Sequence, residues 1–469
     1  MKSAGPKATS TALRTAAWMA ITTWLRRLFG GNYSSRTMQA VRSTVASYLF
    51  TADQRATPKR SAFAATMAIF SAAVFICLAR LGRTRTFDAL WAEDGWVFLQ
   101  DAVNKPWYEA FGSLYAGYLH FLPRLMGELG AVVPIKWAGA VMSFGGTVIT
   151  AFLAVVTFWA SRSILVSAWQ RVTVALAVVL VPNFALESVS NSSHFQWTLM
   201  FTCFWAMLWR PAKRWQQATA LVVIAVTALS DPLLPHFFAL GLVRLWALRD
   251  RYSFVMICTL AASLAVQAAA ILLDTSNRTF ARDNYSALQL GESYFSQVSG
   301  QLMTNWHSPP SHALLWLLIG LVAILAVSAI GADRRAWCFA GLALAFSMAS
   351  HYAFTFVTWT VRPRYEVLPQ ALLLVAVVAL LGRPMQGGRR VIIPRCLVVL
   401  AIAYSCANSF EVGKFRVHGP LWSDELTRAT ATCTSPNPPA QVTLVLPPDP
   451  LFHVTVDCDP LLAGRLGSS

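Results

Sequence analysis

The sequence is poor in charged residues. Only 13% of its 469 residues are Asp, Glu, Lys or Arg, whereas soluble domains carry about 25%. Hydrophobic residues make up 56% of the chain. In water such a chain would expose more apolar surface than a monomer tolerates, so the composition excludes an ordinary soluble protein and predicts a membrane protein.

Three further absences concern zinc sites, signal peptides and repeats. None of the eight cysteines has zinc-ligand spacing. The basic segment before residue 61 lacks a short apolar core with a cleavage site behind it, so a cleaved signal peptide is not expected. No internal repeat typical of inverted-topology transporters is visible.

Cys433 and Cys458 lie in a polar segment near the C-terminus, where an oxidising environment would allow a disulfide.

The net charge of +17 is distributed in short clusters between apolar runs. A nucleic-acid-binding protein would instead gather its Lys and Arg residues in one patch or stripe. Short basic clusters between apolar runs are typical of the topology signals of membrane proteins. The charge pattern therefore predicts membrane lipids as partners and no nucleic acid.

Apolar runs recur along the chain at the length that a bilayer requires. A hydrocarbon core about 30 Å thick needs roughly 20 apolar residues per helix. The run at 217–248 is interrupted by Ser230, Asp231 and Pro232, and it predicts a helical hairpin because Pro232 cannot continue a helix freely. We therefore expect an all-α integral membrane protein with about eleven transmembrane helices and long extracytoplasmic loops. The predicted helices are 61–78, 136–160, 171–188, 195–210, 217–230, 233–248, 253–273, 312–330, 336–358, 367–382 and 393–409.

Lys and Arg in the short loops predict the orientation. With a cytoplasmic N-terminus, every inside loop is net basic and the outside loops hold most of the acids; Arg80, Arg83 and Arg85 are exceptions. Arginine strongly outnumbers lysine, which suggests a GC-rich bacterial genome and a bacterial inner membrane. The predicted parts are a basic cytoplasmic extension (1–60), a transmembrane domain (61–410) with outside loops at 81–134 and 274–311, and a short extracytoplasmic tail (411–469).

Two shorter elements are expected outside the transmembrane domain. Within the tail, residues 441–447 predict a short strand. Within the basic extension, residues 13–29 have the pattern of an amphipathic helix on an anionic leaflet, and a disordered extension is the alternative.

The first outside loop contains two adjacent carboxylates, Glu93 and Asp94, between Trp91 and Trp96. Tryptophan prefers the membrane interface, so we expect both acids at headgroup level. Partial desolvation and a neighbouring like charge would make one of them a useful general base near neutral pH. A solvated acidic turn ending at Gly95 is the alternative.

Further polar residues lie at the outside ends of the apolar runs. Hydrogen-bonding groups beside aromatic rings suit a sugar, which needs hydrogen bonds at its rim and an apolar surface against its face. The alternatives are structural: helix capping for the second outside connection and for Asp231, and a structural histidine for His120, one turn from Arg124. The candidate substrate-binding residues are Tyr118, His120, Asn191, His194, Gln196, Asp231 and Tyr365.

Arg362 and Arg364 lie on the predicted outside, against the positive-inside bias, immediately before an apolar run. Guanidinium groups at headgroup level bind phosphate with paired hydrogen bonds, so these arginines are candidates for a donor phosphate. Snorkelling to lipid headgroups is the alternative.

Carboxylates, arginines and sugar-binding groups on one side suit glycosyl transfer from a lipid-linked phosphosugar. The phosphate leaving group needs a cation more than a general acid, unlike the leaving group in glycoside hydrolysis. With an acidic motif just after helix one and a late Arg364-Tyr365, the chain resembles the GT-C glycosyltransferases. These include protein mannosyltransferases, aminoarabinose transferases of lipid A and arabinosyltransferases.

The resemblance implies a polyprenyl-phosphate or polyprenyl-diphosphate sugar donor. It implies that Glu93 or Asp94 is the catalytic carboxylate, and that Arg364, with Arg362, contacts the donor phosphate. Some GT-C enzymes bind a divalent metal at the acidic motif, where Mg²⁺ or Mn²⁺ would suit oxygen ligands. The clustered acids are too few to predict a metal site, so none is assigned.

We therefore expect a hexosyl- or pentosyltransferase that delivers its sugar to a glycan or lipid acceptor of the cell envelope. Two alternatives are a transporter or flippase of a lipid-linked or envelope precursor, and a polysaccharide polymerase or ligase. A transporter is expected to have ionisable residues near helix midpoints, whereas Glu187, Asp231 and Arg364 lie at the ends of apolar runs.

Overall fold

The computed structural model describes residues 35–52, 58–273, 286–304, 333–358, 363–382, 389–412, 418–448 and 451–466. Within these residues, five helices are long and apolar enough to cross a membrane. The predicted polytopic helical protein is confirmed in this coarser form, but the predicted total of about eleven spans is not. The predicted helix at 312–330 lies outside the described residues. The five candidate spans are Lys59–Leu81, Ile135–Ser163, Arg251–Leu273, Arg334–Phe356 and Pro363–Leu381, and Pro235–Leu248 and Arg395–Asn408 are shorter apolar helices.

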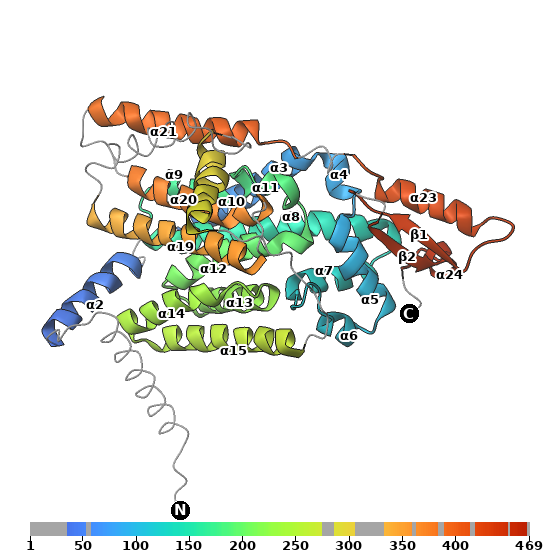
Figure 1. Cartoon of the computed structure of the whole chain (residues 1–469), viewed down its shortest axis with the longest axis horizontal. Coiled ribbons are helices and arrows are strands. Elements are labelled where there is room, and N and C mark those ends of the chain that lie inside the picture. The colour runs from blue at the N-terminus through green and yellow to red at the C-terminus, as the bar shows by residue number, and fades with distance from the viewer. Residues whose placement is uncertain are drawn as a thin grey trace, which may run out of the picture.

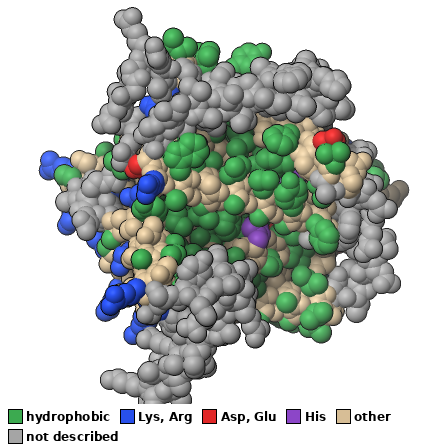
Figure 2. All heavy atoms as spheres, turned by 60° about the vertical axis from the view of Figure 1, so that its left-hand side comes forward, with side chains coloured by type: hydrophobic (Ala, Val, Ile, Leu, Met, Phe, Trp, Pro, Cys, Tyr) green, Lys and Arg blue, Asp and Glu red, His purple; other side chains and the backbone are tan. Residues whose placement is uncertain are grey.

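The helices of the bundle run side by side, and two of them occupy its centre (Figure 1). Every residue of α12 and of α20 is buried. A helix that is apolar on all sides belongs inside a bundle, whereas the outer helices expose Val, Leu and Ile side chains. Figure 2 shows the resulting broad hydrophobic surface on one face of the molecule. The bundle consists of α3 (Lys59–Leu81), α8 (Ile135–Ala160), α12 (Phe195–Leu208), α13 (Arg214–Ser230), α14 (Pro235–Leu248), α15 (Arg251–Leu273), α19 (Arg334–Thr358), α20 (Val367–Leu381) and α21 (Arg389–Asn408).

The predicted hairpin is confirmed, but the single helix predicted at 171–188 is wrong. The break after Ser230 separates α13 from α14, and Asp231 Oδ1 accepts a hydrogen bond from the Leu233 N–H at 2.7 Å. The 171–188 region instead forms three short helices. Val181 precedes Pro182 and has an extended ψ of 144°, because proline disfavours a helical conformation in the residue before it. The three helices are α9 (Ala168–Ala175), α10 (Ala177–Leu180) and α11 (Phe184–Glu187).

The first outside loop is a folded helical layer on the end of the bundle. The N–H and C=O of Leu119 both bond to the side-chain amide of Gln267, at 3.0 and 2.9 Å. The Leu122 N–H donates to Ser230 Oγ at 3.1 Å. These bonds fix the loop to α15 and to the α13–α14 hairpin. The elements of the loop are α4 (Arg83–Phe87), the π-helix η1 (Asp94–Leu99), α5 (Gln100–Asn104), α6 (Trp107–Gly112) and α7 (Phe121–Val132).

The C-terminal tail packs against this first loop. The Ala92 N–H donates to Pro447 O at 2.9 Å, and the Gln100 side chain bonds to both backbone groups of Thr455. The predicted strand and the predicted Cys433–Cys458 disulfide are both confirmed. The tail contains α23 (Trp422–Cys433), the antiparallel strands β1 (Gln441–Val445) and β2 (His453–Asp457), and α24 (Cys458–Leu462).

The loop and the tail lie at one end of the bundle, and α2 (Ser35–Leu49) lies at the other end (Figure 1). Which side of the membrane the loop and the tail occupy stays a prediction. A helical segment from the second long loop runs across the direction of α19 and α21. It consists of α16 (Ala287–Ser293), the π-helix η4 (Tyr294–Gly300) and α17 (Gln301–Thr304); three short 3₁₀ turns are η2 (Ser161–Ser163), η3 (Ser192–His194) and η5 (Pro363–Glu366).

Candidate functional site

The carboxylate of Asp94 connects the first outside loop to the second outside connection. One oxygen accepts the Ser192 N–H at 2.9 Å, and the other accepts the Ser193 N–H at 2.7 Å. Ser192 and Ser193 lie in η3, which leads directly into α12. The first N–H groups of a helix have no partner within the helix and carry partial positive charge, so they stabilise a carboxylate there. Asp94 is buried, and its charge is used to anchor the loop.

Two residues with positive φ precede the two segments that meet at Asp94. Ala92 has φ of 34° and Ser190 has φ of 51°, values that L-residues other than Asn and Asp rarely adopt. Backbone strain of this kind persists only where the surrounding structure enforces it. At Ala92 the restraint is the hydrogen bond to Pro447 O from the C-terminal tail. The tail therefore helps to set the direction of the Glu93–Asp94 motif.

Helix α8 restrains the turn at Ser190. Ser143 Oγ donates to Ser190 O at 3.1 Å, and Thr147 Oγ1 lies 2.7 Å from Ser190 Oγ. Between them, Gly146 lets the turn approach the helix, because a Cβ at this position would lie 3.2 Å from the Asn191 nitrogen. The second outside connection is thus held in place by a membrane helix.

Asn191 organises the side chains around the η3 turn. Its Oδ1 accepts hydrogen bonds from the Ser193 N–H at 3.0 Å and from Ser193 Oγ at 2.6 Å. Its Nδ2 donates to Glu187 O at 2.8 Å and lies 2.8 Å from His194 Nδ1. The amide therefore fixes the orientation of the His194 ring.

Glu187 brings Arg364 to this turn. Glu187 Oε2 lies 2.7 Å from Arg364 Nη1 and 3.6 Å from His194 Nε2. The side chains of Glu187 and Arg364 are 27% and 28% exposed, so the ion pair remains accessible. Glu187 was not among the predicted site residues, although its position at the end of an apolar run was a signal for it.

A continuous set of contacts therefore joins the acidic motif to the late arginine. We call this set the acid–arginine chain. It runs through Asp94, Ser193, Asn191, His194, Glu187 and Arg364.

Glu93 differs from its neighbour Asp94. Its side chain is partly exposed, and within the described part of the protein its carboxylate has no hydrogen bond or ion pair. Of the two predicted catalytic carboxylates, Glu93 is thus the more exposed one. Among the described residues, no group of three or more His, Cys, Asp or Glu side chains forms a metal-binding cluster. With both Asp94 oxygens engaged by amides, the motif does not fit the oxygen-rich shell that Mg²⁺ or Mn²⁺ requires.

Tyr118 and His120 form a separate aromatic cluster. Their rings stack at 4.0 Å, and His120 Nδ1 lies 3.2 Å from Tyr118 O. His120 is buried, and Arg124 forms an ion pair with Asp101. His120 and Arg124, which lie one turn apart, therefore both pack against other residues of the first outside loop.

The remaining predicted site residues are not part of the acid–arginine chain. Asp231 is buried in the hairpin turn, where its Oδ1 accepts the Leu233 N–H. The N-cap residue of α14 is Leu234, so Asp231 does not cap that helix as the structural alternative expected. Burial raises its pKa to about 7 from an ordinary value of 3.8, while the Leu233 N–H acts in the opposite direction. Gln196 is buried at the start of α12, and Tyr365 packs edge-on against Trp197 at 5.5 Å. Arg362 lies outside the described residues.

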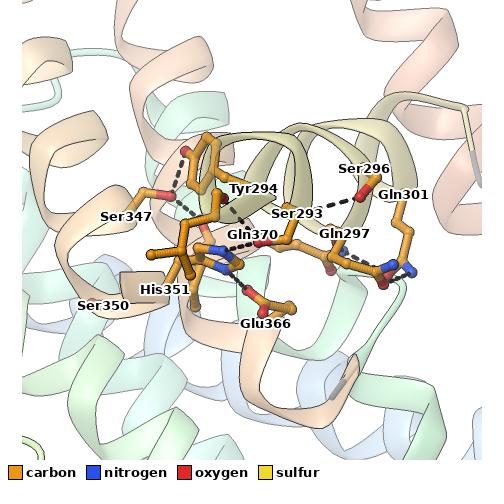
Figure 3. A network of polar contacts seen from close by, with 12 residues as sticks. Ser293, Tyr294, Ser296, Gln297, Gln301, Ser347, Ser350, His351, Glu366 and Gln370 are labelled. Carbon is orange, nitrogen blue, oxygen red and sulfur yellow. Dashed lines mark hydrogen bonds and ion pairs between the residues drawn. The ribbon is translucent and has the colours of Figure 1, made fainter. Parts of the chain in front are cut away.

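A second polar network adjoins the acid–arginine chain through η5 (Figure 3). His351 Nδ1 lies 2.8 Å from Glu366 Oε2, and His351 Nε2 lies 2.9 Å from Ser293 Oγ. Glu366 follows Arg364 by two residues in the same 3₁₀ turn. The turn η5 therefore directs Arg364 to Glu187 and Glu366 into the buried network.

The same network fixes the α16–η4–α17 segment to α19 and α20. Tyr294 and Ser347 share a hydrogen bond of 2.9 Å between their hydroxyl groups. Gln370 Nε2 donates to Gln297 O at 3.1 Å, and Gln301 Nε2 donates to Gln297 Oε1 at 2.7 Å (Figure 3). This network was not predicted, because its polar residues are dispersed among apolar runs and form no local motif.

Comparisons with known proteins give weak structural similarity and no matching sequence family. No family model matches the chain, and no curated protein has a matching sequence. Among solved structures, the chain is similar to the cryo-EM structure of the arabinofuranosyltransferase AftD from Mycobacteria, with a TM-score of 0.45 and 15% sequence identity. The match covers 82% of this chain and 29% of that one, so the chain spans less than a third of the length of AftD.

Proposed function

We propose that this protein is a membrane glycosyltransferase. It would move a sugar from a polyprenyl-phosphate-linked donor to a cell-envelope acceptor on the extracytoplasmic face of a bacterial inner membrane. The observation that carries the proposal is the acid–arginine chain, which links Asp94 of the first outside loop to Arg364. A reaction of this kind needs a base and a phosphate-binding cation at one site.

In this proposal, Glu93 is the catalytic base and Asp94 is a positioning residue. Supporting this division, Glu93 is partly exposed, whereas both oxygens of Asp94 accept backbone hydrogen bonds. A base must reach the acceptor hydroxyl, which a buried carboxylate held by two amides does less readily. Asp94 instead fixes the position of the motif relative to η3.

Arg364 would bind the donor phosphate. Its ion pair with Glu187 and the His351–Glu366 contact restrain η5 from two sides. Preorganised cations stabilise developing negative charge better than mobile ones, because no reorganisation is needed during the reaction. Asn191 and His194 lie beside this ion pair and offer hydrogen bonds to a sugar.

The proposed reaction is a single displacement. The acceptor hydroxyl gives its proton to Glu93 while its oxygen forms a bond to the anomeric carbon of the sugar. The bond from that carbon to the phosphate oxygen breaks, and polyprenyl phosphate leaves with the electron pair. Arg364 stabilises the charge on the departing phosphate. No step requires a metal ion.

A transporter would require ionisable residues along a path through the bundle. The His351–Glu366 pair is the strongest candidate for such a path among the described residues. Glu366, however, directly precedes α20, and His351 lies in the last third of α19, the part that leads toward η5. This location favours a role in supporting η5 over a role in transport.

The test is an assay of purified protein in lipid nanodiscs with a panel of polyprenyl-phosphate sugars and envelope glycan or lipid acceptors. We expect transfer of one sugar to an acceptor, with release of polyprenyl phosphate. Vesicles containing the protein would be tested for movement of the same donors across the bilayer. Donor movement without any transfer product would contradict the proposal and favour a flippase.

A further inference from the structure

A cavity of about 730 Å³ lies at the end of the bundle opposite the C-terminal tail. Helix α2 crosses the ends of α14 and α19 there, and the cavity lies beneath it. Its lining includes Arg42 of α2, Arg210 after α12 and Arg335 of α19. We call this cavity the α2 pocket. Three separate segments thus bring arginines to one site.

The described lining of the α2 pocket carries positive charge. No Asp or Glu is found among the described residues that line it. Burial lowers the pKa of the nearby Arg249, and the positive charge of Arg42 lowers that pKa further. Two acids at the starts of α15 and α19 cap those helices: Asp250 Oδ1 accepts the Ser253 N–H at 2.6 Å, and Asp333 Oδ1 accepts the Ala336 N–H at 2.7 Å. Arginines held together in this way favour a bound anion.

The three arginines have different roles. Arg335 holds α2 in place, because its guanidinium donates to Tyr48 O at 3.1 Å, Thr51 Oγ1 at 2.5 Å and Ser163 O at 2.6 Å. Arg42 is partly exposed and Arg210 is exposed, and neither has a hydrogen bond or ion pair within the described residues. These two guanidinium groups are therefore the ones available to a ligand.

The surroundings of the α2 pocket are apolar. Phe50, Val166 and Ala247 contribute to its lining, and Val166 is 69% exposed. Val41 and Trp169, in the neighbouring α2 and α9, are also exposed. Figure 2 shows Lys and Arg side chains gathered at one edge of the hydrophobic face. These exposed apolar side chains would not interact favourably with a free phosphate ion. They would contact the acyl chains of a lipid whose phosphate headgroup lies in the pocket.

We propose that the α2 pocket binds the phosphate headgroup of an anionic phospholipid from the adjacent leaflet. Arg42 and Arg210 donate hydrogen bonds to the phosphate, and the acyl chains lie against the exposed apolar side chains beside α2. The lipid thereby joins α2 to the ends of α12 and α14. This site is independent of the proposed transfer reaction, which lies at the opposite end of the bundle.

The test measures thermal unfolding of the full-length protein in neutral detergent while phosphatidylglycerol is added. Phosphatidylcholine and inorganic phosphate are the comparison arms. The variant is Arg42→Gln with Arg210→Gln, and the control is Arg214→Gln with Arg251→Gln. The control removes two exposed arginines that begin α13 and α15 and do not line the pocket.

We expect phosphatidylglycerol to stabilise the wild type and the control equally, and phosphatidylcholine to do so much less. The pocket variant should need about tenfold more phosphatidylglycerol for half of the effect. Equal responses of the variant and the control would overturn the proposal, and so would an equal effect of inorganic phosphate. If the double variant aggregates, Arg210→Gln alone provides the test, because this side chain is exposed.

Discussion

The carboxylate of Glu187 lies 2.7 Å from the guanidinium of Arg364, although 177 residues separate the two positions. Glu187 ends α11, and Arg364 lies in η5 directly before α20. The pair is partly exposed, so its electrostatic contribution to stability is modest. The ion pair mainly orients Arg364, because it holds the guanidinium beside the turn that contains Asn191 and His194.

Glu93→Gln should abolish sugar transfer and leave the protein folded. The amide keeps the size of the side chain but cannot accept a proton from the acceptor hydroxyl. Loss of a general base reduces rates by about 10²–10⁴-fold. The measurement is the initial rate of transfer in nanodiscs. Glu109→Gln, an exposed change in the same loop, is the control and should retain full activity. Normal activity of the Glu93 variant would refute its role as base.

Asp94→Asn should reduce stability as well as activity. An amide can accept only one of the two backbone hydrogen bonds, so the Ser192 or Ser193 N–H would face an NH₂ group. We expect a loss of about 1–3 kcal/mol, the usual cost of a buried unpaired donor. Thermal unfolding in detergent measures this effect. The exposed Asp459→Asn change in the tail is the control. An unchanged unfolding temperature would show that the anchor is dispensable.

Arg364→Gln should weaken binding of a polyprenyl-phosphate sugar by about tenfold or more, because a charge-assisted bond to phosphate is lost. Glu187→Gln should weaken donor binding less, since it releases the arginine without removing the cation. Titration of the donor onto each variant provides the affinities. Arg428→Gln, which breaks an ion pair in the tail, is the control. Equal donor affinity in the wild type and the Arg364 variant would exclude the phosphate role.

Asp231 should make stability depend on pH. Its pKa is raised by burial to about 7 in the folded protein from an ordinary 3.8. Its contribution to stability is therefore fully present below pH 3.8 and is lost as pH rises through 7. Asp231→Asn removes this dependence, so its unfolding temperature relative to wild type should increase between pH 5 and pH 8. The exposed Asp424→Asn change should show no such trend. A constant difference across this pH range would argue against a buried titrating acid.

The Cys433–Cys458 disulfide should stabilise the tail. It closes a segment of 25 residues, and loss of such a constraint costs about 3 kcal/mol in the chain-entropy treatment. We expect Cys433→Ser with Cys458→Ser to lower the unfolding temperature, and Cys396→Ser, at an exposed free cysteine, to leave it unchanged. Thiol alkylation before reduction should leave Cys433 and Cys458 unmodified. Labelling of both in the unreduced protein would contradict the disulfide.

The amino-acid sequence alone determined which segments belong in a membrane and how several of them end. Apolar runs of sufficient length predicted α3, α8 and α15, and Pro232 predicted the hairpin after Ser230. The length of an apolar helix and the position of its break depend on residues adjacent in the sequence. Local hydrophobicity and backbone preference are therefore enough to predict both. The same reasoning failed at 171–188, where the apolar run was read as one helix despite Pro182.

Only the tertiary structure decided how the polar residues are used. By residue type, Glu93 and Asp94 were equivalent candidates for the base. In the folded protein, the N–H groups of Ser192 and Ser193 bind the carboxylate of Asp94. The contacts of Glu187 with Arg364 and of His351 with Glu366 likewise join different helical elements. Such pairs depend on the relative position and rotation of packed helices, which the hydrophobic pattern of a single helix does not specify.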